Sequence, residues 1–245
     1  MKKLVKNSSS TAVEAWIFGA TGVVGRALVG ELCARSEATS VTAFVRRPDA
    51  QLLRAFDSDG RTEPRLEERV VAFDRLDLEL AGRTATHVFC CLGTTMAKAG
   101  SERAFRRVDF DYPLAVGRAA LAAGAKKLLV VTAVGADPSS RIFYNRVKGE
   151  LERALEALAL PELHVFRPSL ILADRAERRV GERIAMFAAR PVGALLVGQL
   201  KKYRPIPAVD IARAMVEVAL EREPAKPVNV YEFDQLAALA RGGST

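Results

Sequence analysis

Tyr144 and Lys148 stand four residues apart in the stretch SSRIFYNRVKGE (139–150), whose apolar positions recur at helical spacing. Positions i and i+4 share one face of a helix, so both side chains can point toward one ligand. An ammonium beside a phenol favours the phenolate and lowers a pKa that starts at about 10. Such a tyrosine can exchange a proton with a carbonyl or an alcohol near neutral pH. The pair therefore predicts acid–base chemistry at a carbon–oxygen bond.

A glycine-rich loop, FGATGVVGR (18–26), follows a short apolar run near the start of the chain and opens a helical pattern. Its G-x-x-G-x-x-G spacing is typical of a strand-to-helix turn that lets bare backbone approach a pyrophosphate. The amides at the helix start then face the phosphates. Glycine also marks any tight turn, but this context favours dinucleotide binding. The residues expected to contact the dinucleotide are Gly19, Thr21, Gly22, Val23, Val24 and Gly25.

Two arginines, Arg46 and Arg47, follow the second apolar run, SVTAFV (40–45). An NAD site places an acid there to bond the ribose hydroxyls, whereas the 2′-phosphate of NADP needs a cation. A planar guanidinium suits a phosphate well, so the sequence favours NADP(H), although both arginines can also be plain loop charges before Pro48. Asp74, after the third run, is the candidate acceptor for the adenine amino group, or a cap of the next turn.

Apolar runs and helical patterns alternate along the chain. Continuous apolar strands of this kind are typical of a parallel sheet covered by helices on both faces. The sequence therefore predicts a Rossmann-like, doubly wound α/β fold in one domain, residues 13–240, between a flexible arm (1–12) and a flexible tail (241–245). We expect a small C-terminal substrate region, with residues 174–205 inserted over the carboxyl edge of the sheet, where ligands bind. The predicted strands are 16–18, 40–45, 69–73, 86–92, 126–132, 163–168 and 228–233. The longer predicted helices are 101–124, in which Pro113 marks a new start or a kink, 141–159, and one that Asp210 caps.

Four longer stretches carry a family resemblance: FCCLGTTMAKAG (89–100), RVDFDYPL (107–114), GADPSSRIFYNRVKGELE (135–152) and VFRPSLILADR (165–175). They resemble the Tat-interactive-protein family of NADPH-binding oxidoreductases, which lies in the atypical branch of the short-chain dehydrogenases/reductases. The similarity runs over roughly residues 14–235 in the same order.

The resemblance implies a single Rossmann-like domain, bound NADP(H) and a substrate region in the C-terminal third. It makes Tyr144 and Lys148 the catalytic pair and puts Arg46 at the 2′-phosphate. It also places four residues along the cofactor, with Leu92 and Gly93 beside it and Pro168 and Ser169 beside the nicotinamide.

One position departs from the family pattern. Related enzymes usually carry two hydroxyl residues at the end of the fifth strand, and the second orients the substrate oxygen; here these positions are Thr132 and Ala133. Thr132 supplies a hydroxyl and is counted as an assisting catalytic residue, but successive strand residues point to opposite faces. Ser139 and Ser140 are candidate substitutes from the following loop. Losing one donor at developing charge costs about 2–4 kcal/mol of barrier, which slows a reaction without abolishing it.

The composition, with 49% hydrophobic and 27% charged residues, is typical of a soluble globular protein. The net charge of +8 would suit an anionic partner, but no block of five like charges occurs, so we expect a solvated basic surface and no nucleic acid. Three cysteines form no disulfide framework and MKKLVKNSSS lacks the apolar core of a secretory signal, which together favour a cytoplasmic location. The apolar window 184–200 is too short to span a bilayer, so no membrane contact is expected.

Other candidate reactive residues are interpreted as structural. His87 and His164 lie in or beside apolar strands and are expected to be core histidines rather than bases. Cys90 and Cys91 end a buried strand and are interpreted as packing residues. No spacing of histidine, cysteine and carboxylate suggests a metal site.

The leading hypothesis is an NADP(H)-dependent oxidoreductase that moves a hydride between the nicotinamide and an unidentified carbonyl or alcohol. A second hypothesis is an NADPH-binding regulatory or interaction protein with little turnover, which the alanine at position 133 favours. A third is a nucleotide-sugar epimerase or dehydratase, but such enzymes usually hold NAD through an acid where this chain has Arg46 and Arg47. The expected partners are a small-molecule substrate and, in a homodimer, a second copy of the chain; a monomer and a separate protein partner are the other possibilities.

Overall fold

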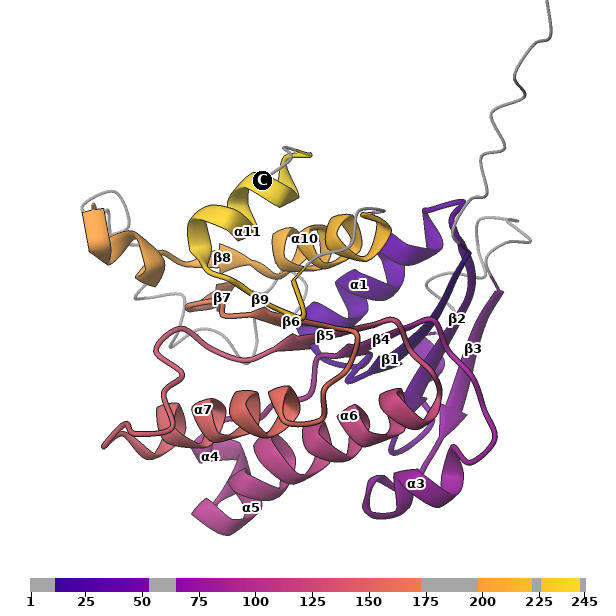
Figure 1. Ribbon diagram of the computed structural model, residues 1–245, viewed down its shortest axis with the longest axis horizontal. Helices are drawn as coiled ribbons and strands as arrows, with labels where there is room; N and C mark the ends of the chain where they lie inside the picture. Colours follow the sequence, from indigo (N-terminus) through magenta and orange to yellow (C-terminus); the bar gives the residue numbers. More distant parts are fainter. Residues whose placement is uncertain (1–11, 53–64, 173–197, 222–225, 243–245) are drawn as a thin grey trace, which may run out of the picture.

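The computed structural model describes residues 12–52, 65–172, 198–221 and 226–242, and every structural statement below refers to these residues. At its centre lies a seven-stranded sheet with the order β3-β2-β1-β4-β5-β6-β9, in which all neighbouring strands run parallel (Figure 1). The order reverses between β1 and β4, and ligands bind at such a switch point. The strands are β1 (Val13–Phe18), β2 (Ala38–Val45), β3 (Arg65–Val70), β4 (His87–Cys90), β5 (Lys127–Val131), β6 (Glu162–Phe166) and β9 (Val228–Tyr231).

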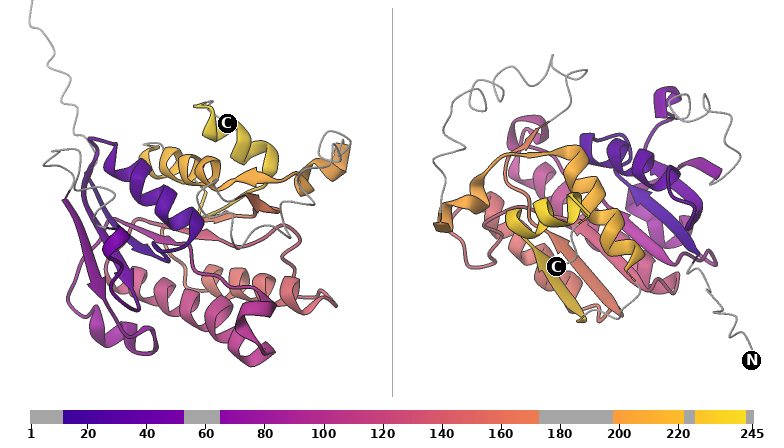
Figure 2. Two further views of the ribbon diagram at one scale, coloured as in Figure 1. Left: turned by 180° about the vertical axis from the view of Figure 1, so that it is seen from behind. Right: turned by 90° about the horizontal axis from the view of Figure 1, so that it is seen from above.

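Helices cover both faces of the sheet, which confirms the predicted doubly wound, Rossmann-like α/β fold (Figures 1 and 2). One face carries α1 (Val23–Cys33), α10 (Ala208–Leu220) and α11 (Phe233–Ala240). The other carries α3 (Leu76–Glu79), α4 (Met96–Ala99), α5 (Glu102–Arg106), α6 (Tyr112–Ala122) and α7 (Phe143–Glu156). Smaller elements are the 3-10 turns η1 (Phe73–Arg75) and η4 (Gly198–Tyr203), the π-helical turn η2 (Arg107–Asp111), and a two-stranded sheet of β7 (Ile171–Leu172) and β8 (Ile206–Pro207).

Alternate residues of the central strands enter two separate cores. Ile17 of β1 and Leu129 of β5 pack on the side of α1 and α10, whereas their neighbours Phe18 and Leu128 pack on the side of α6 and α7. All four side chains are fully buried. Burial on both faces explains why these strands appear in the sequence as continuous apolar runs.

The third strand lies earlier in the chain than the sequence predicts. The prediction was 69–73, but β3 spans Arg65–Val70 and the chain then enters η1. Val71 and Phe73 are apolar because they pack into the core on the α6 side, not because they belong to a strand. β3 is an edge strand, and its sequence RLEERV is polar because much of it stays accessible to water.

Two helix starts differ in detail from the expectations. The cap of α10 is Pro207 rather than Asp210, which lies in the first turn, where its charge complements the helix dipole. The predicted helix over 101–124 is helical from Glu102 to Ala122, but η2 interrupts its α-type bonding: the N–H of Tyr112 bonds the carbonyl of Arg107. Pro113 lies in the first turn of α6, as predicted.

The segment 174–205, expected to be a substrate-region insertion, lies mostly outside the described residues. Its last part forms η4, and β8 follows and pairs with β7. The apolar window 184–200 likewise falls largely outside them. Among the described helices, none is both long enough and apolar enough to cross a membrane.

Candidate active site

The glycine loop between β1 and α1 has the shape expected of a phosphate-binding turn. A Cβ atom on Gly19 would lie 2.6 Å from the carbonyl oxygen of Cys91, and one on Gly25 would lie 2.1 Å from the carbonyl oxygen of Gly19. Both positions therefore exclude any side chain. Gly22 begins α1, and no side chain caps the helix, so its first amides are available to an anion. These features fit the pyrophosphate of a dinucleotide.

The other predicted loop residues line the same turn. Thr21 is exposed, Val23 is half-buried, and Val24 is buried beneath them. Arg26 fastens the loop: its Nε donates to the Thr21 carbonyl at 3.1 Å, and its Nη2 pairs with Asp49 at 2.5 Å. No pattern in the sequence indicates this link, which ties the phosphate loop to the segment after β2.

Arg46 and Arg47 leave the end of β2 as exposed side chains. Among the described residues, neither takes part in an ion pair. The nearby acids are already engaged: the Asp49 carboxylate accepts from Arg26 and from the backbone N–H of Gln51, and the Glu68 carboxylate accepts from the N–H of Asp49. The end of β2 thus offers cations rather than a free acid to a ligand.

Asp74, the candidate adenine acceptor, lies in η1 and is exposed. It forms a two-pronged ion pair with Arg107, whose Nη2 lies 2.6 Å from Oδ2 and whose Nε lies 3.2 Å from Oδ1. The hydrogen bond from Arg107 holds the pKa of the Asp74 carboxyl below its usual range. Asp74 is therefore an ionised acceptor, and an adenine amino group would share it with Arg107.

Lys148 meets the end of β4. A Cβ atom on Gly93, the residue expected beside the cofactor, would lie 3.8 Å from Lys148 Nζ and 3.4 Å from Asp109 Oδ1. Leu92 just before it is half-buried. The predicted cofactor-lining residues and the predicted catalytic lysine therefore converge at the carboxyl edge of the sheet.

Lys148 is held by a carboxylate that the sequence did not reveal. Its Nζ lies 2.7 Å from Asp109 Oδ1, and the Asp109 Oδ2 accepts the backbone N–H of Thr94 at 2.9 Å. The side chains of Lys148 and Asp109 are 3% and 1% exposed, so this is a buried ion pair. Burial raises the pKa of Asp109, and Lys148 opposes that shift. Asp109 lies in η2, and no helical spacing in the sequence marks it as facing inward.

Tyr144 lies one turn before Lys148 on α7, and its ring packs against Phe105 with 5.5 Å between centroids. Burial raises the pKa of the Tyr144 phenol; Lys148 lowers it, and Asp109 raises it again. The net shift is upward, which corrects the expectation that the lysine leaves the phenol with a lowered pKa. The lysine acts in the predicted direction, but desolvation is the larger effect.

The hydroxyl of Thr132 faces α7. It donates to Glu152 Oε1 at 2.6 Å, and Glu152 also pairs with Arg167, which follows β6. Ala133 is buried. Residues 129 and 131 pack toward α1 and α10, whereas residues 128 and 130 pack toward α6 and α7. Thr132 is the next residue in the alternation that includes 128 and 130, so its side chain points toward α6 and α7. The alternation of strand side chains thus explains its direction.

The serines of the following loop are also engaged. Ser139 donates its hydroxyl hydrogen to Asp137 at 2.7 Å, and the Ser140 hydroxyl accepts the N–H of Ile142 at 3.1 Å. Ser139 is exposed. Both contacts are local turn bonds of the kind that serine commonly makes, and among the described residues neither serine hydroxyl is bonded to Tyr144.

Pro168 and Ser169 follow β6 at the same edge of the sheet. The carbonyl of Pro168 accepts the N–H of Val134 at 2.9 Å, which ties the β6 end to the loop after β5. The Ser169 hydroxyl donates to the carbonyl of Arg204, which precedes β8. Both residues thus lie at the carboxyl edge of the sheet, where their contacts fix the two neighbouring loops. Their place beside the nicotinamide stays a prediction.

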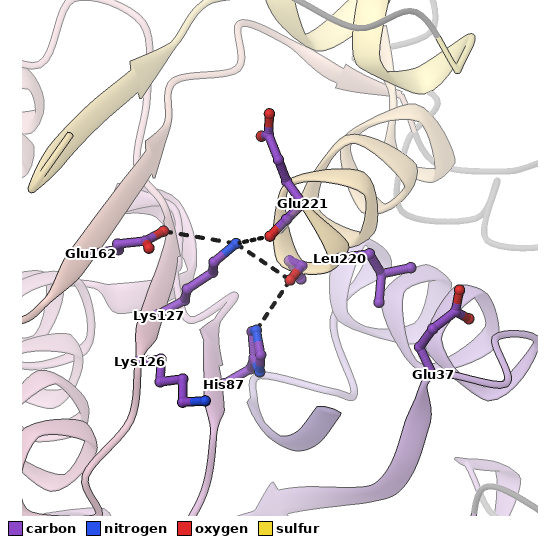
Figure 3. Close-up of a pocket in the computed structure, with 8 residues that line it drawn as sticks. Glu37, His87, Lys126, Lys127, Glu162, Leu220 and Glu221 are labelled. Atoms are coloured by element: carbon purple, nitrogen blue, oxygen red, sulfur yellow. Dashed lines mark hydrogen bonds and ion pairs between the residues drawn. The ribbon is translucent and has the colours of Figure 1, made fainter. Parts of the chain in front are cut away.

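The opposite, amino edge of the sheet holds a cavity of about 210 Å³, lined by the starts of β4, β5 and β6 and the end of α10 (Figure 3). Lys127 donates to the carbonyl of Val218. It also donates to the carbonyl of Glu221, and His87 contacts the carbonyl of Ala219 at the end of α10 (Figure 3). These bonds satisfy carbonyls at the C-terminus of a helix. The cluster is therefore a helix cap, and His87 is the buried structural histidine that the sequence predicts.

His164 is also buried, and it contacts the Tyr231 hydroxyl at 3.0 Å and Glu162 at 3.1 Å. Burial raises the pKa of the Cys90 thiol to about 12, so this strand-end cysteine stays protonated and packs as a small apolar residue. Among the described residues, no group of three or more potential metal ligands converges.

Known proteins resemble this chain in sequence and in fold. Residues 19–168 match the NAD(P)H-binding family. Protein HTATIP2 of Rattus norvegicus is 37% identical over 203 residues, which cover 82% of this chain and 78% of that protein. A mitochondrial FMP52 protein of Coccidioides immitis is 30% identical over 215 residues, covering 83% of this chain and 84% of its own. A short-chain type dehydrogenase/reductase from Mycobacterium ulcerans has a similar structure, with a TM-score of 0.67, 16% identity and coverage of 89% and 88% of the two chains.

The fungal relative corrects the expected cytoplasmic location. Its name places it in mitochondria, and further FMP52 proteins of Eremothecium gossypii and Debaryomyces hansenii carry the same designation. Free thiols are compatible with any reducing compartment, so a cysteine count cannot distinguish one such compartment from another. The inference from cysteine usage to a cytoplasmic location was therefore wrong.

The match to the NAD(P)H-binding family covers more than half of the chain and includes both the glycine loop and the Tyr144–Lys148 helix. The parallel sheet, its switch point and the phosphate turn agree with that match. The chain therefore belongs to the NAD(P)H-binding family and, as the sequence predicts, resembles the Tat-interactive proteins and the atypical short-chain dehydrogenases/reductases.

Proposed function

We propose that the protein is an NADP(H)-dependent oxidoreductase that transfers a hydride between the nicotinamide and a carbonyl or alcohol substrate, with Tyr144 as acid or base. The observation that carries this proposal is the position of Lys148. Its buried ammonium lies beside the bare backbone of Gly93 at the sheet's carboxyl edge, and Tyr144 precedes it by one helical turn. Side chains for cofactor and proton chemistry thus share one edge.

The electrostatics favour the reductive direction. When bound, the nicotinamide supplies the hydride that reaches the carbonyl carbon. Tyr144 then gives the phenol proton to the carbonyl oxygen, which becomes the hydroxyl of the product. Because burial raises the pKa of Tyr144, the phenol is protonated near neutral pH and ready for this step. Lys148 binds the nicotinamide ribose and stabilises the phenolate that remains.

The preference for NADP(H) rests on the end of β2. Arg46 and Arg47 are exposed there, while Asp49 and Glu68 are engaged with protein donors. A guanidinium can bind a 2′-phosphate through two parallel bonds, whereas a ribose hydroxyl would gain little from it. We therefore place the 2′-phosphate at Arg46, with Arg47 beside it, and the adenine toward Asp74.

The assisting role assigned to Thr132 stays a prediction, and the structure defines what it requires. The hydroxyl hydrogen now goes to Glu152, so it must turn toward the substrate oxygen to act as a donor. A missing donor at the developing oxyanion costs about 2–4 kcal/mol of barrier. We expect modest turnover that relies mainly on Tyr144.

Substitution of Tyr144 by phenylalanine tests the mechanism. Tyr144→Phe keeps the ring that packs on Phe105 and removes the proton donor. We expect turnover of the best carbonyl substrate to fall by at least about 100-fold, because general acid catalysis contributes that much, while the Kd for NADPH stays near the wild-type value. Unchanged turnover with NADPH bound would show that the mechanism is wrong.

A second candidate is an NADPH-binding regulatory or interaction protein with little turnover. The bond from Thr132 to Glu152 and the buried methyl of Ala133 favour it, since neither residue presents a free donor to a substrate. Tight NADPH binding without reduction of any member of a broad carbonyl panel, together with a co-purifying protein, would support this candidate. A nucleotide-sugar epimerase or dehydratase is the less favoured third, and NAD binding as tight as NADP binding would revive it.

A further inference from the structure

Asp74 and Arg107 form a well-ordered ion pair that contributes little to the stability of the fold. Their side chains are 57% and 56% exposed, and an exposed ion pair is worth little because water screens it. The contact is nevertheless two-pronged, with Arg107 Nη2 at 2.6 Å from Asp74 Oδ2 and Arg107 Nε at 3.2 Å from Asp74 Oδ1. It also joins residues that are 33 positions apart in the chain. Such a pair is a candidate for the recognition of a ligand.

The pair borders the edge of the sheet at which the cofactor is proposed to bind. Asp74 lies in η1, just after β3. Arg107 begins η2, and Asp109 of the same turn accepts the backbone N–H of Thr94, just after β4. Strands β2 and β1, which lead into the two arginines and the glycine loop, lie between β3 and β4. The pair therefore lies beside the half of the crevice in which the proposed function places the adenine.

The Arg107 guanidinium is held in place although it is exposed. Besides the Asp74 carboxylate, it meets the face of the Tyr112 ring, with 5.7 Å between Arg107 Cζ and the ring centroid. The Tyr112 ring packs in turn on Phe73, with 5.4 Å between centroids, and Phe73 is buried in the core. A side chain that is fixed in advance loses less conformational freedom when a ligand binds. The pair is therefore preorganised for a contact.

Both partners keep hydrogen-bonding capacity for a ligand. A guanidinium has five N–H donors and a carboxylate has about four lone-pair positions, of which the ion pair uses two each. Arg107 Nη2 and Asp74 Oδ2 thus present a free donor next to a free acceptor. The backbone donor that follows Asp74 is already engaged, because the N–H of Arg75 bonds the carbonyl of Ala72 at 2.9 Å. The donor at this place is therefore Arg107.

We propose that Asp74 and Arg107 together recognise the adenine base of the cofactor: Asp74 accepts from the amino group, and Arg107 donates to the ring nitrogen beside it. This inference rests on the proposed function and deepens it, because it assigns the base specificity of the same cofactor site to Arg107. Adenine presents an amino donor next to a ring-nitrogen acceptor, and a matching acceptor and donor side by side distinguish it from other bases. Hypoxanthine carries an oxygen in place of the amino group. That oxygen would face the Asp74 carboxylate with no hydrogen between them.

Reduced nicotinamide hypoxanthine dinucleotide phosphate is the probe, because it differs from NADPH only in the base. We expect the wild type to bind NADPH at least about tenfold more tightly than this analogue, with both Kd values measured by calorimetry. Arg107→Met should lower that preference by about fivefold, because only adenine loses a hydrogen bond. A general loss of attraction to the anionic cofactor affects both dinucleotides alike and cancels in the ratio. The matched control is Arg106→Met, which removes a charge paired with Glu150 from the next residue and should leave the ratio unchanged.

A second variant tests the other half of the pair. Asp74→Asn should also lower the preference for NADPH, because an amide can turn its NH₂ group toward the oxygen of the analogue. Both side chains are more than half exposed, so both variants should keep the fold. Equal binding of the two dinucleotides by the wild type, or an unchanged ratio in Arg107→Met, would overturn the inference while the proposed function stands. Full turnover by Tyr144→Phe would instead overturn the proposed mechanism, and the ratio of Kd values would still test Arg107.

Discussion

Gly22 and Gly25 are expected to be glycines for different physical reasons, one the approach of the cofactor and the other the packing of the protein. Replacing each by alanine should distinguish these two reasons. A Cβ on Gly25 would lie 2.1 Å from the Gly19 carbonyl oxygen and 2.8 Å from the Ala20 Cα, so α1 and the loop must move apart by roughly 1 Å. Overpacking of this kind costs about 1–3 kcal/mol. A Cβ on Gly22 would lie 3.4 Å from the same oxygen, and its φ of −80° suits any residue. Within the part of the chain that the structure describes, no packing or backbone demand requires glycine at position 22.

Thermal unfolding without cofactor and titration with NADPH distinguish the two cases. Gly25→Ala should lower Tm by several degrees, since about 1 kcal/mol corresponds to about 2–4 °C in a domain of this size, and this loss occurs despite the better helix propensity of alanine. Gly22→Ala should leave Tm near the wild-type value but raise the Kd for NADPH at least tenfold, because the added methyl meets the pyrophosphate. The reasoning fails if Gly22→Ala lowers Tm as much as Gly25→Ala does, or if it binds NADPH with unchanged affinity.

Three further changes have definite expected outcomes. The double variant Arg46→Ala, Arg47→Ala should weaken NADPH binding by at least about tenfold and leave NADH binding unchanged. An equal loss of affinity for both cofactors would contradict the assignment of the 2′-phosphate. Glu152→Gln should lower the free energy of unfolding by about 1–3 kcal/mol, because Arg167 loses its charged partner. Urea unfolding at neutral pH measures this change. An unchanged midpoint would argue against a stabilising role for the contacts among Thr132, Glu152 and Arg167. Burial holds the pKa of His87 at about 4, well below the value of about 6.5 in an unfolded chain. Between about pH 4 and pH 6.5 the unfolded state therefore binds more protons than the folded state, and the free energy of unfolding falls as the pH is lowered through this range. The loss of stability from this one group approaches about 3 kcal/mol. The His87→Gln variant should lack this loss, and the assignment would be refuted if its stability depended on pH between about 4 and 6.5 as strongly as that of the wild type.

The fold follows from the sequence because its physical causes are local and repetitive. Strands buried on both faces are mostly apolar, and β1, β4, β5 and β6 show this in their runs of buried apolar residues, with polar residues mainly near their amino ends. β3 is the exception, because an edge strand with exposed residues loses the apolar signal. The strand was therefore predicted too late in the chain, because the prediction followed Val71 and Phe73. These residues are apolar because they pack into the core after the strand has ended.

The site was predictable where a residue type answers a demand that spacing makes visible. The glycine loop, the arginines after β2 and the Tyr144–Lys148 pair belong to this group. Asp109 does not, because a π turn changes which residues of a helix face inward, and that change leaves no mark in an apolar pattern. The upward pKa shift of Tyr144 was missed for a related reason: spacing shows which charge is near, but the depth of burial depends on the packed structure.

Lys127 and Lys148 show how partners separate a structural lysine from a functional one. Both are buried, at 6% and 3% exposure, at opposite edges of the same sheet. The Lys127 amine donates to carbonyls of Val218, Ala219 and Glu221, so a helix end uses its hydrogens. Lys148 meets one carboxylate beside the bare backbone of Gly93. A buried ammonium directed by a single anion toward bare backbone has donors left for a ligand, so substitution of Lys127 should first affect folding and substitution of Lys148 should first affect cofactor binding.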